Sequence, residues 1–124
     1  MIDYTKFPDM ADIYLEDSFV LSIEETPGTF VFKLDAVLTP AHPNYHHPSP
    51  GEQYCYADGA LVFTGVSRVT WLARSVGHYI DASGQEDLGN IDNLTINDGA
   101  FVVEGDWGKV RIETSSQPRF QIAG

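Results

Sequence analysis

Two stretches in the first third of the chain alternate apolar and polar residues, which is the spacing of a half-buried β-strand. In residues 18–24 the alternation places Phe19, Leu21 and Ile23 on one face, and residues 30–36 repeat it with Phe30, Phe32, Leu34 and Ala36. Pro27-Gly28, between the two stretches, is a pair typical of turns. The pattern therefore predicts a β-hairpin.

Shorter strands are predicted along the rest of the chain. Asn97-Asp98-Gly99 favours a turn with positive φ and predicts a second hairpin, and Gly105–Gly108 predicts a third turn. Gly65 interrupts a β-rich region and indicates a bulge or a break. The predicted strands are Ala60–Thr64, Val66–Arg74, Ile91–Asn97, Ala100–Gly105, Lys109–Thr114 and, as an edge strand, Arg119–Ile122.

Helix signals are confined to the segment from Pro8 to Leu15, where one or two turns are predicted. Roughly seven to nine short strands with regular turns are typical of an antiparallel sandwich or barrel. The predicted fold is therefore mainly β: a single domain over residues 1–124, an antiparallel β-sandwich or flattened barrel with a short N-terminal helical turn. The pattern leaves sandwich and barrel both open.

Length and charge narrow the classes of function. A chain of 124 residues is the size of one domain, and no apolar run is long enough for a membrane span. The start shows no secretory signal, and the single cysteine, Cys55, cannot form an internal disulfide, so a reducing cytoplasm is expected. The net charge of −11, from 18 acidic and 7 basic residues, disfavours nucleic acid and anionic membranes. Such a surface either attracts a basic protein or serves solubility.

A proline-rich segment, Thr39–Gly51, carries three histidines and is predicted to be a loop or an edge. The stretch from His47 to Glu52, with Gly59 further on, resembles the second half of the first metal-binding motif of the cupin family. That resemblance implies a divalent metal held by His47, Glu52 and His78, with Tyr45 in place of a missing histidine. The alternative is that these histidines are solvated loop residues.

An acidic segment, residues 81–92, is the second irregular region. Its alternating oxygen ligands are compatible with a calcium loop, although Glu86 stands where that loop needs glycine, and a solvated loop is the alternative. Trp107, in its glycine-flanked turn, either caps the core or anchors a partner. The candidate protein-binding residues are Asp81, Glu86, Asp87, Asp92, Asp106 and Trp107.

Cys55, between two tyrosines, is either a small buried apolar residue or a nucleophile paired with His47 or His78. Four short patterns resemble a family of small bacterial proteins of unassigned function, and this resemblance implies no catalytic residues. They are Leu15-Glu16-Asp17-Ser18, Pro50-Gly51-Glu52 with Cys55-Tyr56, Asp87–Asp92, and Gly105–Gly108.

Three hypotheses follow. The first is a non-enzymatic module that binds a basic protein, as small acidic bacterial immunity proteins bind basic toxins; charge complementarity is its physical basis. The second is a cupin-like protein that binds a metal or a small ligand and could be an enzyme. The third is a structural or oligomer-forming module that pairs through an edge strand such as Arg119–Ile122.

Overall fold

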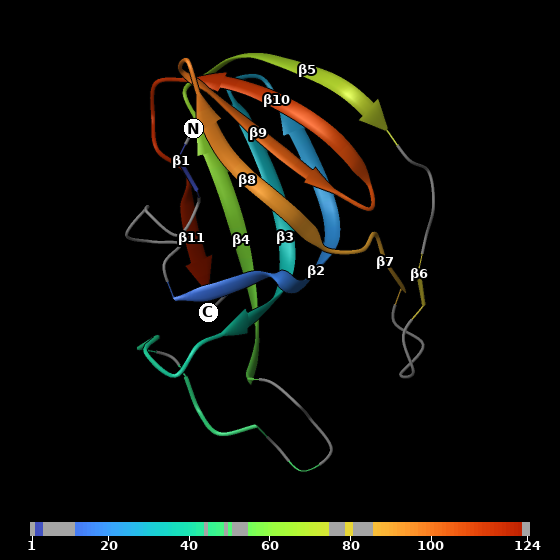
Figure 1. Cartoon of the computed structure of the whole chain (residues 1–124), viewed down its shortest axis with the longest axis vertical. Helices are drawn as coiled ribbons and strands as arrows, with labels where there is room; N and C mark the ends of the chain where they lie inside the picture. The colour runs from blue at the N-terminus through green and yellow to red at the C-terminus, as the bar shows by residue number, and fades with distance from the viewer. Residues whose placement is uncertain are drawn as a thin grey trace.

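The strands of the computed structural model form two antiparallel sheets that pack face to face (Figure 1). The structure describes residues 2–3, 12–43, 45–48, 50, 55–74, 79–80 and 86–122. Sheet A has the order β1-β8-β9-β10-β5 and sheet B the order β11-β4-β3-β2, so each sheet ends in edge strands. Of the two architectures predicted from the sequence, the described strands form the sandwich.

The strand bounds agree closely with the alternation in the sequence. Sheet A contains β1 (Ile2–Asp3), β5 (Val66–Arg74), β8 (Ile91–Asn97), β9 (Ala100–Gly105) and β10 (Gly108–Thr114). Sheet B contains β2 (Ile13–Thr26), β3 (Thr29–Leu38), β4 (Cys55–Thr64) and β11 (Arg119–Ile122). A separate two-stranded ribbon pairs β6 (Tyr79–Ile80) with β7 (Glu86–Asp87).

The predicted turns are confirmed. Gly28 has φ 79° in the turn between β2 and β3, and Asp98 and Gly99 have φ 51° and 75° in the turn between β8 and β9. Two consecutive positive φ values define the type I′ turn, which matches the twist of the strands that it joins. The segment Gly105–Gly108 also turns as predicted, from β9 into β10.

Gly65 is the corner between the two sheets. It alone separates β4, in sheet B, from β5, in sheet A, and its φ of 61° is one that glycine adopts without strain. The backbone N–H of Val66 then donates to the carbonyl of Gly28 at 3.0 Å. The break predicted at Gly65 is therefore the point at which the chain crosses the sandwich.

The core lies between the inner faces of the two sheets. Strands β2, β3, β4, β8, β9 and β10 contribute buried apolar side chains. Aromatic rings fill the centre, with Phe32 5.1 Å from Trp107 and 6.3 Å from Phe63 between ring centroids. Val110 and Ile112 point inward as their alternation predicts. The largest fully buried side chains are Phe30, Phe32, Phe63, Phe101, Ile13, Leu15, Leu34, Leu61, Ile91, Leu94 and Ile112.

Two sequence predictions are wrong within β2. Ile13–Leu15 belong to the strand and not to a helical turn, because Ile13 and Leu15 are buried on either side of an exposed Tyr14, as the strand period requires. The remainder of that predicted turn, residues 8–11, lies outside the described residues. Phe19, Leu21 and Ile23 do not share a buried face: Val20 is buried and Phe19 is exposed, because the pairing of β2 with β3 shifts between Val20 and Ser22.

No helix that could cross a membrane occurs in the part of the chain that the structure describes.

Candidate protein-binding surface

The predicted metal ligands are described only at His47. Its side chain is exposed, its ring lies edge-on to Tyr45 with 6.2 Å between centroids, and its carbonyl lies 3.0 Å from Nδ1 of His46. Glu52 and His78 lie outside the described residues. Among the residues that are described, no three His, Cys, Asp or Glu side chains come together as a metal site. Metal binding by His47, Glu52 and His78 therefore stays a prediction.

Cys55 is part of the core. Its side chain is buried at the start of β4, and its Sγ accepts a hydrogen bond from the backbone N–H of His46 at 3.5 Å. Of the two interpretations of this residue, the structure shows the small buried side chain.

Trp107 is also a core residue and not a surface anchor, which corrects its inclusion among the protein-binding residues. Only 2% of its surface is exposed. Its ring packs against Phe32 and stands perpendicular to Trp71 at 5.9 Å, and its Nε1–H donates to the carbonyl of Asn90 at 3.0 Å. The turn that carries Trp107 folds the indole inward, where burial of a large ring stabilises the fold most.

That hydrogen bond brings together three segments that are distant in sequence. Asn90 also donates from Nδ2 to the carbonyl of Glu16 at 2.8 Å. Val20 donates its N–H to the carbonyl of Gly89 at 2.7 Å, and Leu88 donates to the carbonyl of Val20 at 2.8 Å. The segments 15–20, 88–92 and 105–108 therefore meet at one end of the sandwich.

Four exposed carboxylates surround this meeting point, and we call them the acidic junction: Glu16, Asp17, Asp92 and Asp106. Ile91 and Gly105 are paired on antiparallel strands, so Asp92 and Asp106 lie on opposite sides of this pair. The side chain of Asp106 lies against Gly89, so close that a Cβ at Gly89 would stand 2.5 Å from Cβ of Asp106. Asp92 and Asp106, two of the predicted protein-binding residues, are thus both close to this end of the sandwich.

Of the other predicted binding residues, Asp81 lies outside the described residues. Glu86 and Asp87 form β7, which is described as backbone only, in register with Ile80 and Tyr79. Sequence reasoning did not select Glu16 and Asp17, because the strand that carries them was predicted to begin only at residue 18. The one available signal was the Leu15–Ser18 pattern, which falls at this meeting point.

A bulge in β2 shapes the neighbouring outer face of sheet B. Tyr14 pairs with Val37, and Phe19 pairs with Asp35, so the four residues Leu15–Ser18 stand opposite the single residue Ala36. The buried hydroxyl of Ser18 repairs the ladder: it donates to the carbonyl of Tyr14 at 2.6 Å and accepts from the N–H of Val37 at 2.9 Å. The bulge projects Glu16 and Asp17 outward in succession.

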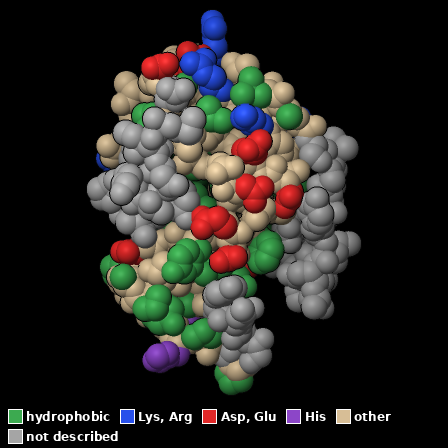
Figure 2. Space-filling view, in the orientation of Figure 1, with side chains coloured by type: hydrophobic (Ala, Val, Ile, Leu, Met, Phe, Trp, Pro, Cys, Tyr) green, Lys and Arg blue, Asp and Glu red, His purple; other side chains and the backbone are tan. Residues whose placement is uncertain are grey.

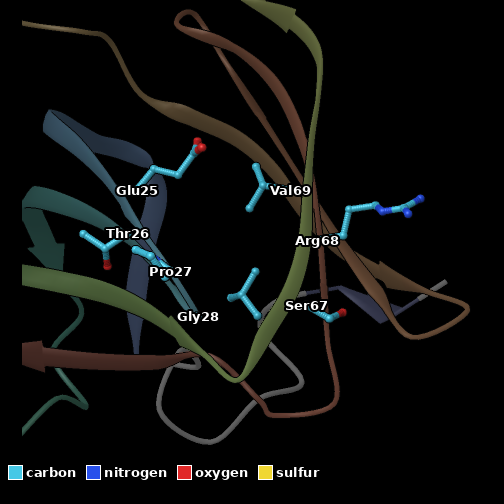
Figure 3. Close-up of a pocket in the computed structure, with 8 residues that line it drawn as sticks. Glu25, Thr26, Pro27, Gly28, Ser67, Arg68 and Val69 are labelled. Atoms are coloured by element: carbon cyan, nitrogen blue, oxygen red, sulfur yellow. The ribbon is translucent and has the colours of Figure 1, made fainter.

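A shallow groove lies at the opposite end, between the turn from β2 to β3 and the start of β5 (Figure 3). Its volume is about 390 Å³, and Glu25 and Val69 face each other across it, whereas Arg68 points away. The Glu25 carboxylate already accepts a hydrogen bond from Nε1 of Trp71 at 3.0 Å. The lining residues contain no histidine, cysteine or lysine, and the groove offers no pairing of a nucleophile with a base.

Comparisons with known proteins found no match: no protein-family model, no curated protein and no solved structure resembles the chain.

Proposed function

We propose that this chain is a non-enzymatic protein-binding module that holds a basic partner protein through its acidic junction. The observation that carries the proposal is the convergence of Glu16, Asp17, Asp92 and Asp106 from three separate segments onto one end of the sandwich. Carboxylates that share a small area produce a negative potential, and such a potential speeds the association of a positively charged partner.

The pairing of the basic residues supports the same proposal. Arg68 and Arg111 lie 3.8 and 3.5 Å from the carboxylate of Glu113, Lys33 lies 3.5 Å from Glu24, and Arg74 lies over the ring of Trp71 at 4.3 Å. Among the described residues, no lysine or arginine forms an ion pair with Asp17, Asp92 or Asp106. In Figure 2 the acidic side chains spread across the middle of the visible face, and the basic ones gather toward its upper end.

The meeting point beneath the acids is well suited to present them to a partner. Backbone hydrogen bonds hold segments 15–20 and 88–92 together, and the buried Trp107 fixes the turn that carries Asp106. Charges on a fixed scaffold lose less conformational entropy on binding than charges on a free loop. A reducing compartment, the cytoplasm, is the location we expect for the module, because Cys55 is a buried free thiol.

The test is capture of a partner from cell extract by the immobilised chain, followed by association kinetics with the purified partner. Asp106→Asn removes one charge from the acidic junction. Asp98→Asn is the matched control, because Asp98 is also an exposed turn aspartate of sheet A but lies at the opposite end, and asparagine tolerates its positive φ.

We expect a partner rich in lysine and arginine whose association rate constant falls steeply with ionic strength. Asp106→Asn should lower that rate constant by about twofold or more, and Asp98→Asn should change it less. A captured protein that is neutral or acidic, or equal effects of the two variants, would contradict the proposal.

A further inference from the structure

Strand β5 forms an open edge of sheet A. It is the last strand in the order β1-β8-β9-β10-β5, and an edge strand presents a row of backbone N–H and C=O groups that no neighbouring strand pairs. Within the described residues, the one backbone hydrogen bond that β5 makes outside its pairing with β10 joins Val66 to Gly28. The edge of β2, in contrast, is bonded at Val20 to segment 88–89. Among the described strands, β5 can therefore accept a further strand.

Two bulges limit the usable length of this edge. The register between β5 and β10 passes over Ser67 and Leu72, so these two residues have no partner in the pairing. The residues between them, 68–71, are in regular register with residues 110–113 of β10. Bulges are one of the devices that prevent long edge-to-edge pairing of sheets. Only a short extended segment can therefore pair here, and we call residues 68–71 the open segment.

The groove between β5 and the turn from β2 to β3 lies beside the open segment (Figure 3). Two hydrogen bonds between the sheets frame this groove. The N–H of Val66 donates to the carbonyl of Gly28, and Nε1 of Trp71 donates to Oε1 of Glu25, each at 3.0 Å. A strand added to β5 would direct alternate side chains toward the inner side of sheet A, where the groove lies.

The groove is apolar on one side and negatively charged on the other. Val66 and Val69 are half-buried and pack against the core, so they form an apolar wall on β5. Glu25 faces Val69 across the groove, and Arg68, the one cation among the lining residues, points away (Figure 3). No lysine or arginine forms an ion pair with Glu25 in the part of the chain that the structure describes. A side chain with an apolar stem and a positive end therefore fits the groove best.

We propose that the open segment of β5 binds a short extended segment of a partner protein, which adds a strand to sheet A and places one lysine side chain in the groove. The main chain of that segment pairs with β5 and supplies affinity, and the groove supplies specificity. The lysine stem lies along Val66 and Val69, and its ammonium group approaches the carboxylate of Glu25. This inference goes beyond the proposed function, because the groove lies at the opposite end of the sandwich from the acidic junction.

Lysine suits the groove better than other side chains do. Oε1 of Glu25 already accepts a hydrogen bond from Trp71, and an ammonium group needs only one carboxylate oxygen, whereas a guanidinium binds best to both oxygens at once. A neutral apolar side chain would take water from the carboxylate without replacing its hydrogen bonds, which costs free energy. An acidic side chain would be repelled by Glu25.

The experiment titrates the isotope-labelled whole chain with three blocked heptapeptides and follows the amide and indole N–H signals by NMR. The parent peptide is Thr-Val-Thr-Lys-Thr-Val-Thr, which as a strand places its lysine and both valines on one face. In the second peptide norleucine replaces lysine, which keeps an apolar stem and removes the charge. In the third, proline replaces the threonine on each side of the lysine, which keeps the charge and removes backbone donors.

Two variants of the chain test the role of the carboxylate. Glu25→Gln removes the charge from the groove and keeps an oxygen that can accept the hydrogen bond from Trp71. Glu24→Gln is the matched control, because Glu24 is the adjacent exposed glutamate, lies 3.5 Å from Lys33 and does not line the groove. The indole signal of Trp71 reports on the groove and that of Trp107 on the core. Thermal melting checks that each variant folds.

We expect the parent peptide to shift the amide signals of the open segment and the indole signal of Trp71, and to leave the indole signal of Trp107 in place. The parent peptide should bind about threefold or more tightly than either of the other two peptides. Glu25→Gln should bring the ratio of the affinities for the lysine and norleucine peptides close to one, and Glu24→Gln should leave that ratio unchanged.

Equal binding of the parent and proline peptides would overturn the inference, because strand addition requires main-chain pairing. An affinity ratio that Glu25→Gln does not alter, or a parent peptide that shifts no signal of the open segment, would also overturn it. Shifts of the same signals on dilution of the chain alone would assign this edge to a second copy of the chain, against the inference.

The variant Asp106→Asn separates this inference from the proposed function. It should leave binding of the parent peptide unchanged, and weaker binding would place the peptide at the acidic junction and overturn the inference. Failure of the peptide to bind leaves the acidic junction as proposed, and failure to capture a basic partner leaves the groove as inferred here.

Discussion

Part of the outer face of sheet B arranges its charges differently from the outer face of sheet A. On sheet A, Glu113 lies between Arg68 and Arg111, and Asn93 donates to Glu104 at 3.4 Å. On sheet B, Asp35 stands opposite Asp58, and Phe19, the β2 neighbour of Asp35, stacks with Tyr56. Sheet A compensates charge within the chain, whereas this part of sheet B places charge and aromatic surface together.

Each face also has a serine at a bulge, and the two serines differ in burial. Ser18 in β2 is 1% exposed and makes two hydrogen bonds in the ladder with β3. Ser67 in β5, where the pairing with β10 shifts, is exposed and donates to the carbonyl of Glu113 at 3.1 Å. The same residue type therefore completes the hydrogen-bond ladder inside sheet B and lies exposed on an edge strand of sheet A.

The largest effect is expected in the core that both faces share. Trp107→Ala should lower the free energy of unfolding by about 3–5 kcal/mol, because it removes a buried ring between the two sheets. Urea denaturation measures the change. Leu72→Ala, at an exposed position of β5, should stay within about 0.5 kcal/mol of the wild type. A small effect at Trp107 would mean that its turn does not support the acidic junction.

The two bulges provide a direct comparison of intermediate size. Ser18→Ala should destabilise the chain by about 1–3 kcal/mol, because the buried N–H of Val37 loses its acceptor. Ser67→Ala should cost less than about 0.5 kcal/mol, because water replaces an exposed hydroxyl. Denaturation of the two variants under the same conditions tests the contrast. Equal costs would remove the distinction between the faces.

Charge reversal should change stability least, but with opposite sign in the two sheets. Asp58→Lys places a cation opposite Asp35 and should stabilise sheet B by about 0.2–1 kcal/mol. Glu113→Lys places a third cation beside Arg68 and Arg111 and should destabilise sheet A by a similar amount. Thermal unfolding at low ionic strength resolves the sign, and two shifts of the same sign would contradict the comparison.

Local patterns in the sequence predicted the turns well because each turn depends on adjacent residues. Asp98-Gly99 specifies two positive φ values by itself, and Pro27-Gly28 specifies the first hairpin. Alternation was enough to locate Ile91–Asn97 and Arg119–Ile122 to the residue.

The candidate site was less predictable because it depends on pairing between distant segments. The alternation predicts that Phe19 points inward, but two register shifts, at Leu15–Ser18 and between Val20 and Ser22, place it on the outer face. The only local sign of the first register shift in the sequence is Ser18, whose hydroxyl makes the hydrogen bonds that the strand pairing loses there. The sequence could not predict whether Trp107 is buried or exposed, because a tryptophan in a glycine-flanked turn can point inward or outward. Its inward position depends on a hydrogen bond to the distant Asn90.

The corner at Gly65 also has a consequence for the order of folding. The hairpins β2–β3 and β8–β9 close short loops, which cost little chain entropy and form early. The contact between Val20 and Leu88 joins positions far apart in the sequence and closes a much longer loop, so it forms after the local hairpins. Because only Gly65 separates β4 from β5, formation of one sheet fixes the position at which the other sheet starts. The end of the sandwich at which segments 15–20 and 88–92 meet is therefore completed last, after the hairpins have assembled.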